Sequence, residues 1–288
     1  MRHAPAIAEA RHNVRVFLKD KLALVGVIWI TLTFALAVFA PVVAPYPSQG
    51  RGASDVANRL QAPSWQHPFG TDELGRDVLS RIIYGARLAL LMPFVVMFAV
   101  VIIGIPLGGI AGYFGGLIDE IVMRVTDLFL AFPGIILAMA LVAFMGASLR
   151  NVGIALVLTW WPWYTRLVRG MAVSLRQRGY TKAARTMGVS DWRIVLRHIV
   201  PNSLGPCIVQ MTLDVGTVIL EVAGLSFLGL GAQPPTPDWG LMISTGREYA
   251  IQQWWIGMFP GLAIFLLVLA FNFVGDGLRD VLDPRAKR

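Results

Sequence analysis

Residues 180–201 read YTKAARTMGVSDWRIVLRHIVP, a polar and basic segment between long apolar runs. Good helix formers fill its first half, and Gly188 can take the left-handed conformation that ends a helix. Ser190 follows as a candidate N-cap, and Asp191 comes next, where the first turn of a helix favours an acid. The segment therefore predicts two short helices joined by a bend, with Pro201 ending the second helix.

The predicted second helix is amphipathic. Its apolar stripe occupies positions i, i+3, i+4 and i+7 and consists of Trp192, Val195, Leu196 and Ile199. Arg193 and Arg197 lie on another face, four residues apart. A bent, cationic helix pair of this kind suits docking into a groove of another protein. An ordinary cytoplasmic loop made basic by membrane topology is the alternative.

The composition of the 288-residue chain is that of a membrane protein. Charged residues make up 15% of it and hydrophobic residues 56%, with a mean hydropathy of +0.64, whereas soluble domains carry about 25% charged residues. The net charge of +8 does not indicate nucleic-acid binding, because the basic residues flank apolar runs. Cys207 is the single cysteine, which excludes an intrachain disulfide and a cysteine metal cluster.

Runs of about 20 apolar residues can cross a bilayer, and the chain contains six candidates. We expect Gly115 and Gly116 to end the second span, and Pro133–Gly134 to kink the third. The fourth is the shortest and carries four aromatic residues suited to an interfacial belt, Trp160, Trp161, Trp163 and Tyr164. The predicted spans are residues 22–44, about 88–112, 128–149, 151 to about 168, 203–231 and 254–275.

The distribution of basic residues predicts the orientation of these spans. With the N-terminus inside, 18 of the 25 lysines and arginines fall in inner segments and seven in outer ones. The positive-inside rule therefore predicts that both termini are cytoplasmic and that residues 180–201 face the cytoplasm.

Residues 45–87 are predicted as a long outer loop rich in glycine and proline. Gly70 and Gly75 permit tight turns, and Asp72, Arg76 and Asp77 can pair with one another. Either the loop is structural, or it contacts the transported substrate directly.

Two acids, Asp214 and Glu221, fall inside a predicted span. An ionised group in hydrocarbon costs at least roughly 2.5 kcal/mol at the bilayer centre, so both should face a cavity or a partner. They are seven residues apart and share a helix face. One hypothesis places them on the translocation path, where they meet cationic substrate groups, and the other pairs them with a neighbouring subunit. The small residues of 224–231 that follow favour close helix packing.

Several motifs of catalysis and nucleotide binding are absent from the sequence. The four histidines have no metal-ligand spacing, and there is no phosphate-binding Gly-x-x-x-x-Gly-Lys-Ser/Thr loop. Neither Gly-x-Ser-x-Gly nor His-Glu-x-x-His occurs. We expect no catalytic residue and no metal site, and we expect any driving ATP to bind elsewhere.

The segment around Ala183-Ala184, Gly188 and Pro201 resembles the "EAA" loop of ABC importer permeases, which docks into the ATPase subunit. Lys182 stands where that family usually has Glu, and His198 and Val200 also depart from the general pattern. The ending at 197–202, the loop at 70–77, the stretch at 233–240 and the tail at 277–284 are similar to dipeptide, oligopeptide and nickel permeases.

This resemblance implies an all-α membrane protein of six transmembrane helices with the type I ABC importer permease fold. Residues 1–87 would form a cytoplasmic lead, an extra first span and an extracytoplasmic loop. Residues 88–288 would form a five-span core with a coupling loop at 171–202. The coupling residues it implies are Lys182, Ala183, Ala184, Arg185, Gly188, Asp191, Arg193, Arg197, His198 and Pro201.

The resemblance also implies a multi-pass subunit of the bacterial cytoplasmic membrane that imports di- or oligopeptides by alternating access. Its partners would be a second homologous permease, two ATPase subunits that bind ATP and Mg, an extracytoplasmic solute-binding protein and the lipid bilayer. Import of nickel or a metal chelate is the alternative, since 161–166 and 213–216 look closer to the nickel branch. A secondary transporter or channel is a more distant one, although no paired interrupted helices are found.

Overall fold

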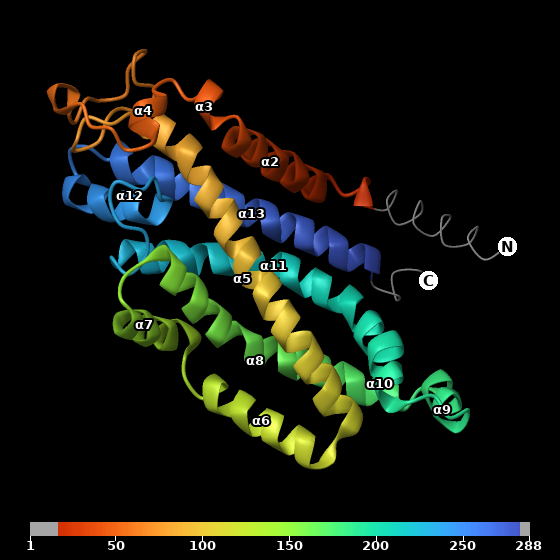
Figure 1. The fold of residues 1–288 in the computed structure, drawn as a ribbon. Coiled ribbons are helices and arrows are strands. Elements are labelled where there is room, and N and C mark those ends of the chain that lie inside the picture. The colour runs from red at the N-terminus through yellow and green to blue at the C-terminus, as the bar shows by residue number, and fades with distance from the viewer. Residues whose placement is uncertain (1–16, 283–288) are drawn as a thin grey trace. The chain divides into compact units, whose positions relative to one another are not determined.

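A computed structural model describes residues 17–282, and within that range the chain is helical or loop apart from one isolated bridge between Thr71 and Asp77 (Figure 1). Arg2, Arg11 and Arg15 of the predicted lead lie outside the described residues, as do the tail residues 283–288. The elements are α2 (Lys21–Val38), α3 (Ala40–Val43), α4 (Pro47–Gly50), η1 (Val56–Asn58), α5 (Val78–Phe114), α6 (Gly116–Leu130), α7 (Gly134–Met145), α8 (Leu149–Arg176), α9 (Gly179–Thr186), α10 (Asp191–Ile194), the π-turn η2 (Val195–Ile199), α11 (Val200–Phe227), α12 (Trp239–Gly246), η3 (Arg247–Tyr249) and α13 (Trp255–Leu282).

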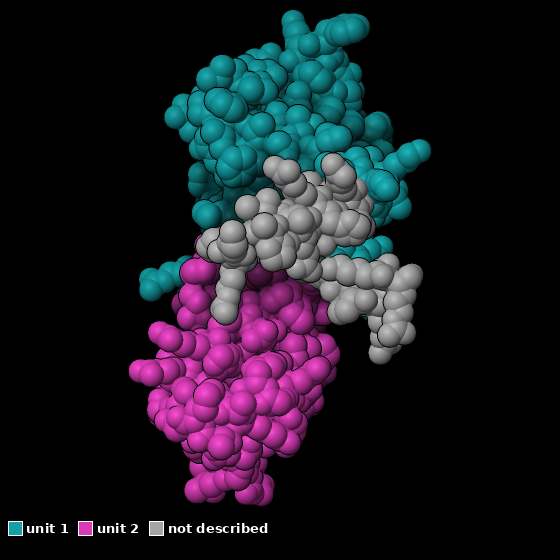
Figure 2. All heavy atoms as spheres, turned by 90° about the vertical axis from the view of Figure 1, so that its right-hand side faces the viewer, with its two compact units in different colours: residues 1–94, 142–153, 212–288 teal, residues 95–141, 154–211 magenta. Residues whose placement is uncertain are grey.

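The chain divides into two compact units, coloured separately in Figure 2. The first comprises residues 1–94, 142–153 and 212–288 and holds the outer loop and both intramembrane acids. The second comprises residues 95–141 and 154–211 and holds the segment 180–201.

Four helical stretches of residues 17–282 are long and apolar enough to cross a membrane. They are α2, α5, α13 and the continuous stretch from Asp191 to Phe227, and they coincide with the first, second, sixth and fifth predicted spans. The second span begins earlier than predicted, because α5 starts at Val78. Arg81 and Arg87 made that region look like a loop. In the structure both lie on the helix and donate to main-chain carbonyl groups, Arg87 to that of Ala37.

The predicted third span at 128–149 is wrong as a single helix. α6 ends at Leu130, α7 begins at Gly134, and the two axes differ by 84°. Proline at 133 has no N–H for a continued helix, and the break is far sharper than the predicted kink. Counted as one bent span, this pair brings the number of candidate spans to five.

The predicted fourth span is helical but differs in two ways. It belongs to the 28-residue helix α8, which does not reach the hydropathy of the other candidate spans because polar and aromatic residues interrupt its apolar run. The predicted aromatic belt is wrong for Trp161 and Tyr164, since both side chains are buried. Tyr164 instead packs against α5, where a Cβ on Gly104 would come within 2.7 Å of its own Cβ.

In the first unit, α2 packs along α13, as Figure 1 shows. Asp20 caps α2 by accepting from the backbone N–H of Leu22 at 2.9 Å and of Ala23 at 3.2 Å. Gly26 lets the two helices approach, because a Cβ there would lie 2.6 Å from the carbonyl oxygen of Ala270. The extra first span is therefore tied to the last helix.

In the second unit, α5 meets α8 along a stripe of glycines at i, i+4 and i+8. A Cβ on Gly112 would lie 2.5 Å from the carbonyl oxygen of Arg169, and one on Gly108 would press on the carbonyl of Thr165. Such small-xxx-small stripes let backbones come into contact. The seam between α5 and α8 forms the base on which residues 180–201 rest.

Candidate functional site

Residues 179–199, here called the elbow, form the two helices with a bend that the sequence predicts. α9 ends at Thr186, and Gly188 has φ +80, the left-handed conformation. The N–H of Gly188 donates to Arg185 O at 3.0 Å, and that of Val189 donates to Ala184 O at 3.1 Å. Ser190 holds the N-cap position of α10, but its side chain makes no capping hydrogen bond. The predicted position of the N-cap is therefore correct, but the predicted capping hydrogen bond of the Ser190 side chain does not form.

Pro201 does not end the second helix. The π-turn η2 follows α10 directly, the N–H of Val200 donates to Val195 O, and α11 continues to Phe227. Pro201 is the second residue of α11 and directly follows the π-turn, so it lies inside a continuous helical stretch. The wider turn before it relieves the clash that a proline ring makes within a regular helix. The elbow is thus continuous with the helix that carries Asp214 and Glu221.

The buried face of the elbow differs from the predicted stripe. Ala184, Ile194, Val195 and Ile199 are buried in one cluster with Tyr113 of α5 and Ala172 of α8. Trp192 and Leu196, predicted to belong to the apolar stripe, are 56% and 64% exposed. The predicted stripe assumed regular α-helical spacing through residue 199, and the π-turn rotates the face that is buried.

The outer surface of the elbow is apolar and cationic together. Met187 is 76% exposed, so it joins Trp192 and Leu196 as an uncovered apolar side chain. Exposed residues also include most of the predicted coupling residues, namely Lys182, Ala183, Arg185, Gly188, Arg193 and Arg197. Large apolar side chains grouped on a surface mark a contact with another molecule.

A polar contact fixes the elbow to the end of α5. The hydroxyl of Tyr113 donates to Asp191 Oδ1 at 2.5 Å, and Arg185 Nε lies 3.7 Å from the same oxygen. The sequence identified Asp191 as a favourable first-turn acid, and the resemblance implied it as a coupling residue, but neither paired it with Tyr113. Tyr113 was not singled out, because a tyrosine at the end of an apolar run carries no distinguishing signal. His198, another predicted coupling residue, is half-buried with its ring 6.0 Å from that of Tyr180.

Ion pairs join α6 to α8 in the second unit. Asp119 accepts from Arg169 Nε at 2.9 Å and from Nη2 at 2.6 Å, and Asp127 accepts from Arg166. A two-point guanidinium–carboxylate contact fixes orientation as well as distance. The short charged stretch predicted between the second and third spans is therefore an amphipathic helix.

The two intramembrane acids lie on α11 in the first unit. Asp214 is 8% exposed, and Glu221 is half-buried. Both take part in interactions within the chain, so neither is an isolated charge. Their seven-residue spacing on a continuous helix places them on one face, as predicted. Their place on a translocation path stays a prediction.

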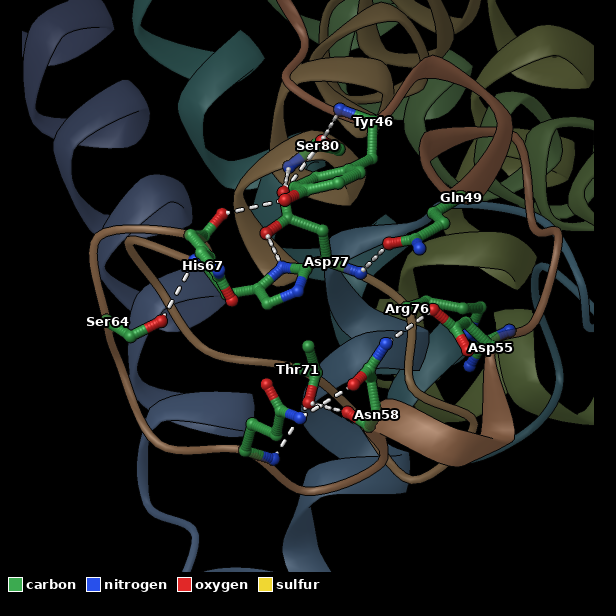
Figure 3. Close-up of polar contacts among 12 residues, drawn as sticks. Tyr46, Gln49, Asp55, Asn58, Ser64, His67, Thr71, Arg76, Asp77 and Ser80 are labelled. Atoms are coloured by element: carbon green, nitrogen blue, oxygen red, sulfur yellow. Dashed lines mark hydrogen bonds and ion pairs between the residues drawn. The ribbon is translucent and has the colours of Figure 1, made fainter.

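The outer loop holds a closed polar network (Figure 3). Arg76 donates to Asp72 at 2.6 Å and to Glu73 at 2.8 Å, which confirms the predicted pairing of Arg76 with Asp72. Asp77 pairs with His67 instead, with 3.0 Å between Oδ1 and Nδ1, while its Oδ2 accepts from Ser80. Burial, and then the charge of Asp72, raise the pKa of Glu73 above its ordinary value. Most of these groups satisfy one another, as a structural loop requires, although Glu73 Oε2 is buried without a hydrogen-bond partner among the described residues.

Two tryptophans that the sequence did not single out hold this loop and the start of α5 in the first unit. Trp255 donates to Thr71 O at 3.1 Å, and Trp239 donates to Ile82 O at 3.0 Å. Arg81 reaches the carbonyls of Pro235 and Thr236, each at 3.4 Å. The stretches 70–77 and 233–240, far apart in sequence, are therefore held in one assembly. Asp238 caps α12 there, and burial raises the pKa of its carboxyl group.

Comparison with known proteins places these features in a family. Residues 104–288 match the family described as "Binding-protein-dependent transport system inner membrane component". The chain belongs to this family. Residues 11–63 match a second description, "N-terminal TM domain of oligopeptide transport permease C", which covers the extra first span.

Relatives of this inner membrane component align over nearly its whole length. It is 48% identical to the dipeptide transport system permease protein DppC of Alkalihalophilus pseudofirmus, over 98% of this chain and 92% of that one. It is 44% identical to the probable D,D-dipeptide transport system permease protein DdpC of Escherichia coli, over 92% and 88%. The glutathione transport system permease protein GsiD of Pectobacterium atrosepticum is 43% identical, over 95% and 90%.

The fold is that of a type I ABC importer permease. A chain of the inward-facing MetNI methionine ABC transporter superimposes with a TM-score of 0.56 at 21% identity, covering 70% of this chain and 97% of that one. The all-helical architecture of the described residues agrees with this fold.

Proposed function

We propose that this chain is a transmembrane subunit of an ATP-driven importer of short peptides. Its relatives are named as dipeptide, D,D-dipeptide and glutathione permeases, and they align over at least 92% of this chain. Glutathione is itself a small peptide, so the three names share one substrate chemistry. Nickel or metal-chelate import has no comparable support among these relatives.

The observation that carries the proposal is the continuity of the elbow with α11. A partner can bind the elbow through the exposed side chains of Met187, Trp192 and Leu196. The elbow is itself anchored to the rest of the second unit by its buried apolar cluster. The stretch from Asp191 to Phe227 is helical throughout. Movement of the elbow therefore acts on the helix that bears Asp214 and Glu221. Such coupling requires a helix that can occupy two positions. ATPase binding at the elbow and substrate binding near the acids must each favour one of these positions.

The partners follow from this role. Two ATPase subunits bind ATP and Mg on the cytoplasmic face, and one of them holds the elbow. A second, similar permease completes the path, and a solute-binding protein delivers peptide from outside. Both termini are cytoplasmic in this arrangement, as the distribution of basic residues predicts.

Asp214 and Glu221 supply negative charge along the path. A peptide carries a cationic amino terminus, and a half-buried carboxylate attracts it more strongly than one in water. Replacing both acids by Asn and Gln should lower transport while the ATPase subunits remain bound. Transport at the full rate would remove these residues from the path.

The elbow is tested by replacing one exposed apolar residue with an acid. Ala184 is buried, so a bulky residue there would disrupt the core; Met187→Glu changes the surface only. Val56→Glu is the matched control, because Val56 is 57% exposed in the outer loop. Burying an unpaired charge in an interface costs several kcal/mol, so Met187→Glu should reduce copurification of the ATPase subunits at least tenfold.

Equal retention of the ATPase subunits by both variants would overturn the docking role of the elbow. A wild-type chain that transports peptides without any ATPase subunit would overturn the importer assignment itself and favour a secondary transporter or channel.

A further inference from the structure

A cationic cavity of about 190 Å³ opens beside the elbow in the second unit. The end of α5, the end of α8 and the helix α9 form its walls. It is lined by Tyr113, Arg176, Gln177, Thr181, Lys182 and Arg185. Since one water occupies about 30 Å³, the cavity holds roughly six waters, which is ample for a tetrahedral oxyanion.

The charges around this cavity leave an excess of positive charge. Arg176, Lys182 and Arg185 line it, and Asp191 is the carboxylate next to them, 3.7 Å from Arg185 and bonded to Tyr113. The hydroxyl of Tyr113 is committed to Asp191, and that of Thr181 donates to Leu175 O at 2.9 Å. The donors that remain to face a ligand are the two guanidinium groups, the Lys182 ammonium and the Gln177 amide. This is a donor set for an anion.

Lys182 makes the net charge of this cavity clearly positive. It occupies the position where the EAA pattern has Glu, and a carboxylate there would face Arg176 and Arg185. With Lys182 in place the three cations share the cavity with one acid, and their mutual repulsion disfavours an empty site. An anion relieves that repulsion.

The cavity lies where the apolar helix α5 and the less apolar helix α8 end. α5 ends at Phe114 and α8 at Arg176, and exposed apolar side chains flank them at Leu117 and Val173. In the proposed orientation, the inner end of the α5 span lies at the headgroup level of the bilayer. Basic pockets between membrane helices on the cytoplasmic side bind the headgroups of anionic lipids.

We propose that this cavity binds the phosphate group of an anionic phospholipid of the inner leaflet, held by Arg176, Lys182 and Arg185. The proposal rests on the orientation in the proposed function, which places the elbow in the cytoplasm. The bound phosphate brings α9 and the ends of α5 and α8 together, so lipid composition sets how firmly the elbow is held. Soluble phosphate shares this chemistry and is the other source to be distinguished.

The test measures lipid retention by the purified complex of this chain with its partner subunits. Phosphatidylglycerol and phosphatidylcholine are titrated onto the detergent-solubilised complex and counted by native mass spectrometry. Arg176→Gln should weaken phosphatidylglycerol binding roughly fivefold, as expected for one basic residue facing an anionic headgroup. Arg178→Gln is the matched control, since it removes the same charge two residues further on, outside the cavity. Arg176→Lys should keep most of the affinity.

Inorganic phosphate is titrated in a second arm. If inorganic phosphate displaces phosphatidylglycerol only when Arg176 is present, the cavity is a phosphate site. Its natural ligand is then soluble phosphate and not the lipid. Equal retention of both lipids by the wild type with no effect of phosphate would overturn the proposal. So would a loss of ATPase subunits from Arg176→Gln with lipid retention unchanged, because a carboxylate of the partner would then occupy the cavity.

If Arg176→Gln fails to assemble, Lys182→Gln takes its place against the same control. The lipid measurement is separate from the importer assignment. A complex that keeps its ATPase subunits and transports peptide while ignoring phosphatidylglycerol refutes the lipid site alone.

Discussion

The outer loop and the elbow are both polar segments next to apolar helices, yet they use their charges in opposite ways. In the loop, Asp72 and Arg76 are buried and face each other, and Asp77 faces His67. In the elbow, Arg193 and Arg197 point outward among exposed apolar side chains. Charge that is satisfied internally builds a structure, whereas charge left on an apolar surface is available to a partner. The predictions below test this contrast.

The largest effect is expected from Arg76→Met in the loop. This change removes the arginine that Asp72 and Glu73 share and leaves the buried Asp72 with the longer ion pair to Arg81, at 3.6 Å. Breaking one side of a buried ion pair costs about 3–5 kcal/mol. The measurement is the thermal unfolding of the solubilised complex. Arg124→Met is the control, because its pair with Glu120 is exposed and worth little. Similar losses in both variants would show that the loop pair is not structural.

The next effect concerns the base of the elbow and is expected from Gly108→Ala. The new Cβ would press on the carbonyl of Thr165 and lie 2.9 Å from the amide nitrogen of Arg169. Forcing α5 and α8 apart should cost about 1–3 kcal/mol. Gly109→Ala is the neighbouring control, since its Cβ would meet only Val200, at an ordinary 3.5 Å, and Ile199, at 3.9 Å. Equal unfolding temperatures for the two variants would contradict the close seam.

A smaller effect is expected from Tyr113→Phe. This variant removes the hydrogen bond to Asp191 and keeps the ring in the elbow cluster. The loss should be about 1 kcal/mol, accompanied by faster amide exchange of residues 179–188. Tyr180→Phe serves as the control, because its exposed side chain retains the same ring contact with His198. Unchanged exchange in Tyr113→Phe would show that the elbow is held by its apolar core alone.

The smallest effect is a pH dependence in the loop. Burial raises the pKa of Glu73 above its ordinary value of 4.5. Because the folded pKa is the higher one, the contribution of Glu73 to stability is complete below the unfolded pKa and is lost as pH rises through the folded pKa. Relative to Glu73→Gln, the wild type should therefore lose stability as the pH rises above the ordinary pKa of 4.5. Parallel unfolding curves for the two proteins across that range would exclude a raised pKa.

The sequence predicted well wherever local chemistry is sufficient. Gly188 was expected in a left-handed conformation and has it, and four of the predicted spans coincide with apolar helices. It failed where a distant partner changes the local preference. Arg81 and Arg87 looked like loop residues until carbonyl groups elsewhere in the first unit accepted their hydrogen bonds. The prediction at Pro201 failed for a local reason, because no pattern in the sequence indicates the π-turn that accommodates the proline.

The candidate site shows the same division. The position and the bend of the elbow follow from residues 180–201, because helix propensity and glycine conformation are local properties. Which of its side chains are buried does not follow, since Trp192 and Leu196 occupy predicted core positions and are exposed. The division into residues 1–87 and 88–288 stays a prediction.

By itself, the sequence determined that this chain is a helical membrane protein with a basic elbow between spans, because hydropathy and charge distribution are properties of the chain alone. Only the tertiary structure decided what the elbow presents to a partner and which polar groups satisfy one another. Those outcomes depend on contacts between residues far apart in the sequence, such as Tyr113 with Asp191 and Thr71 with Trp255. No local pattern encodes such a pair, because its energy exists only once both helices are in place.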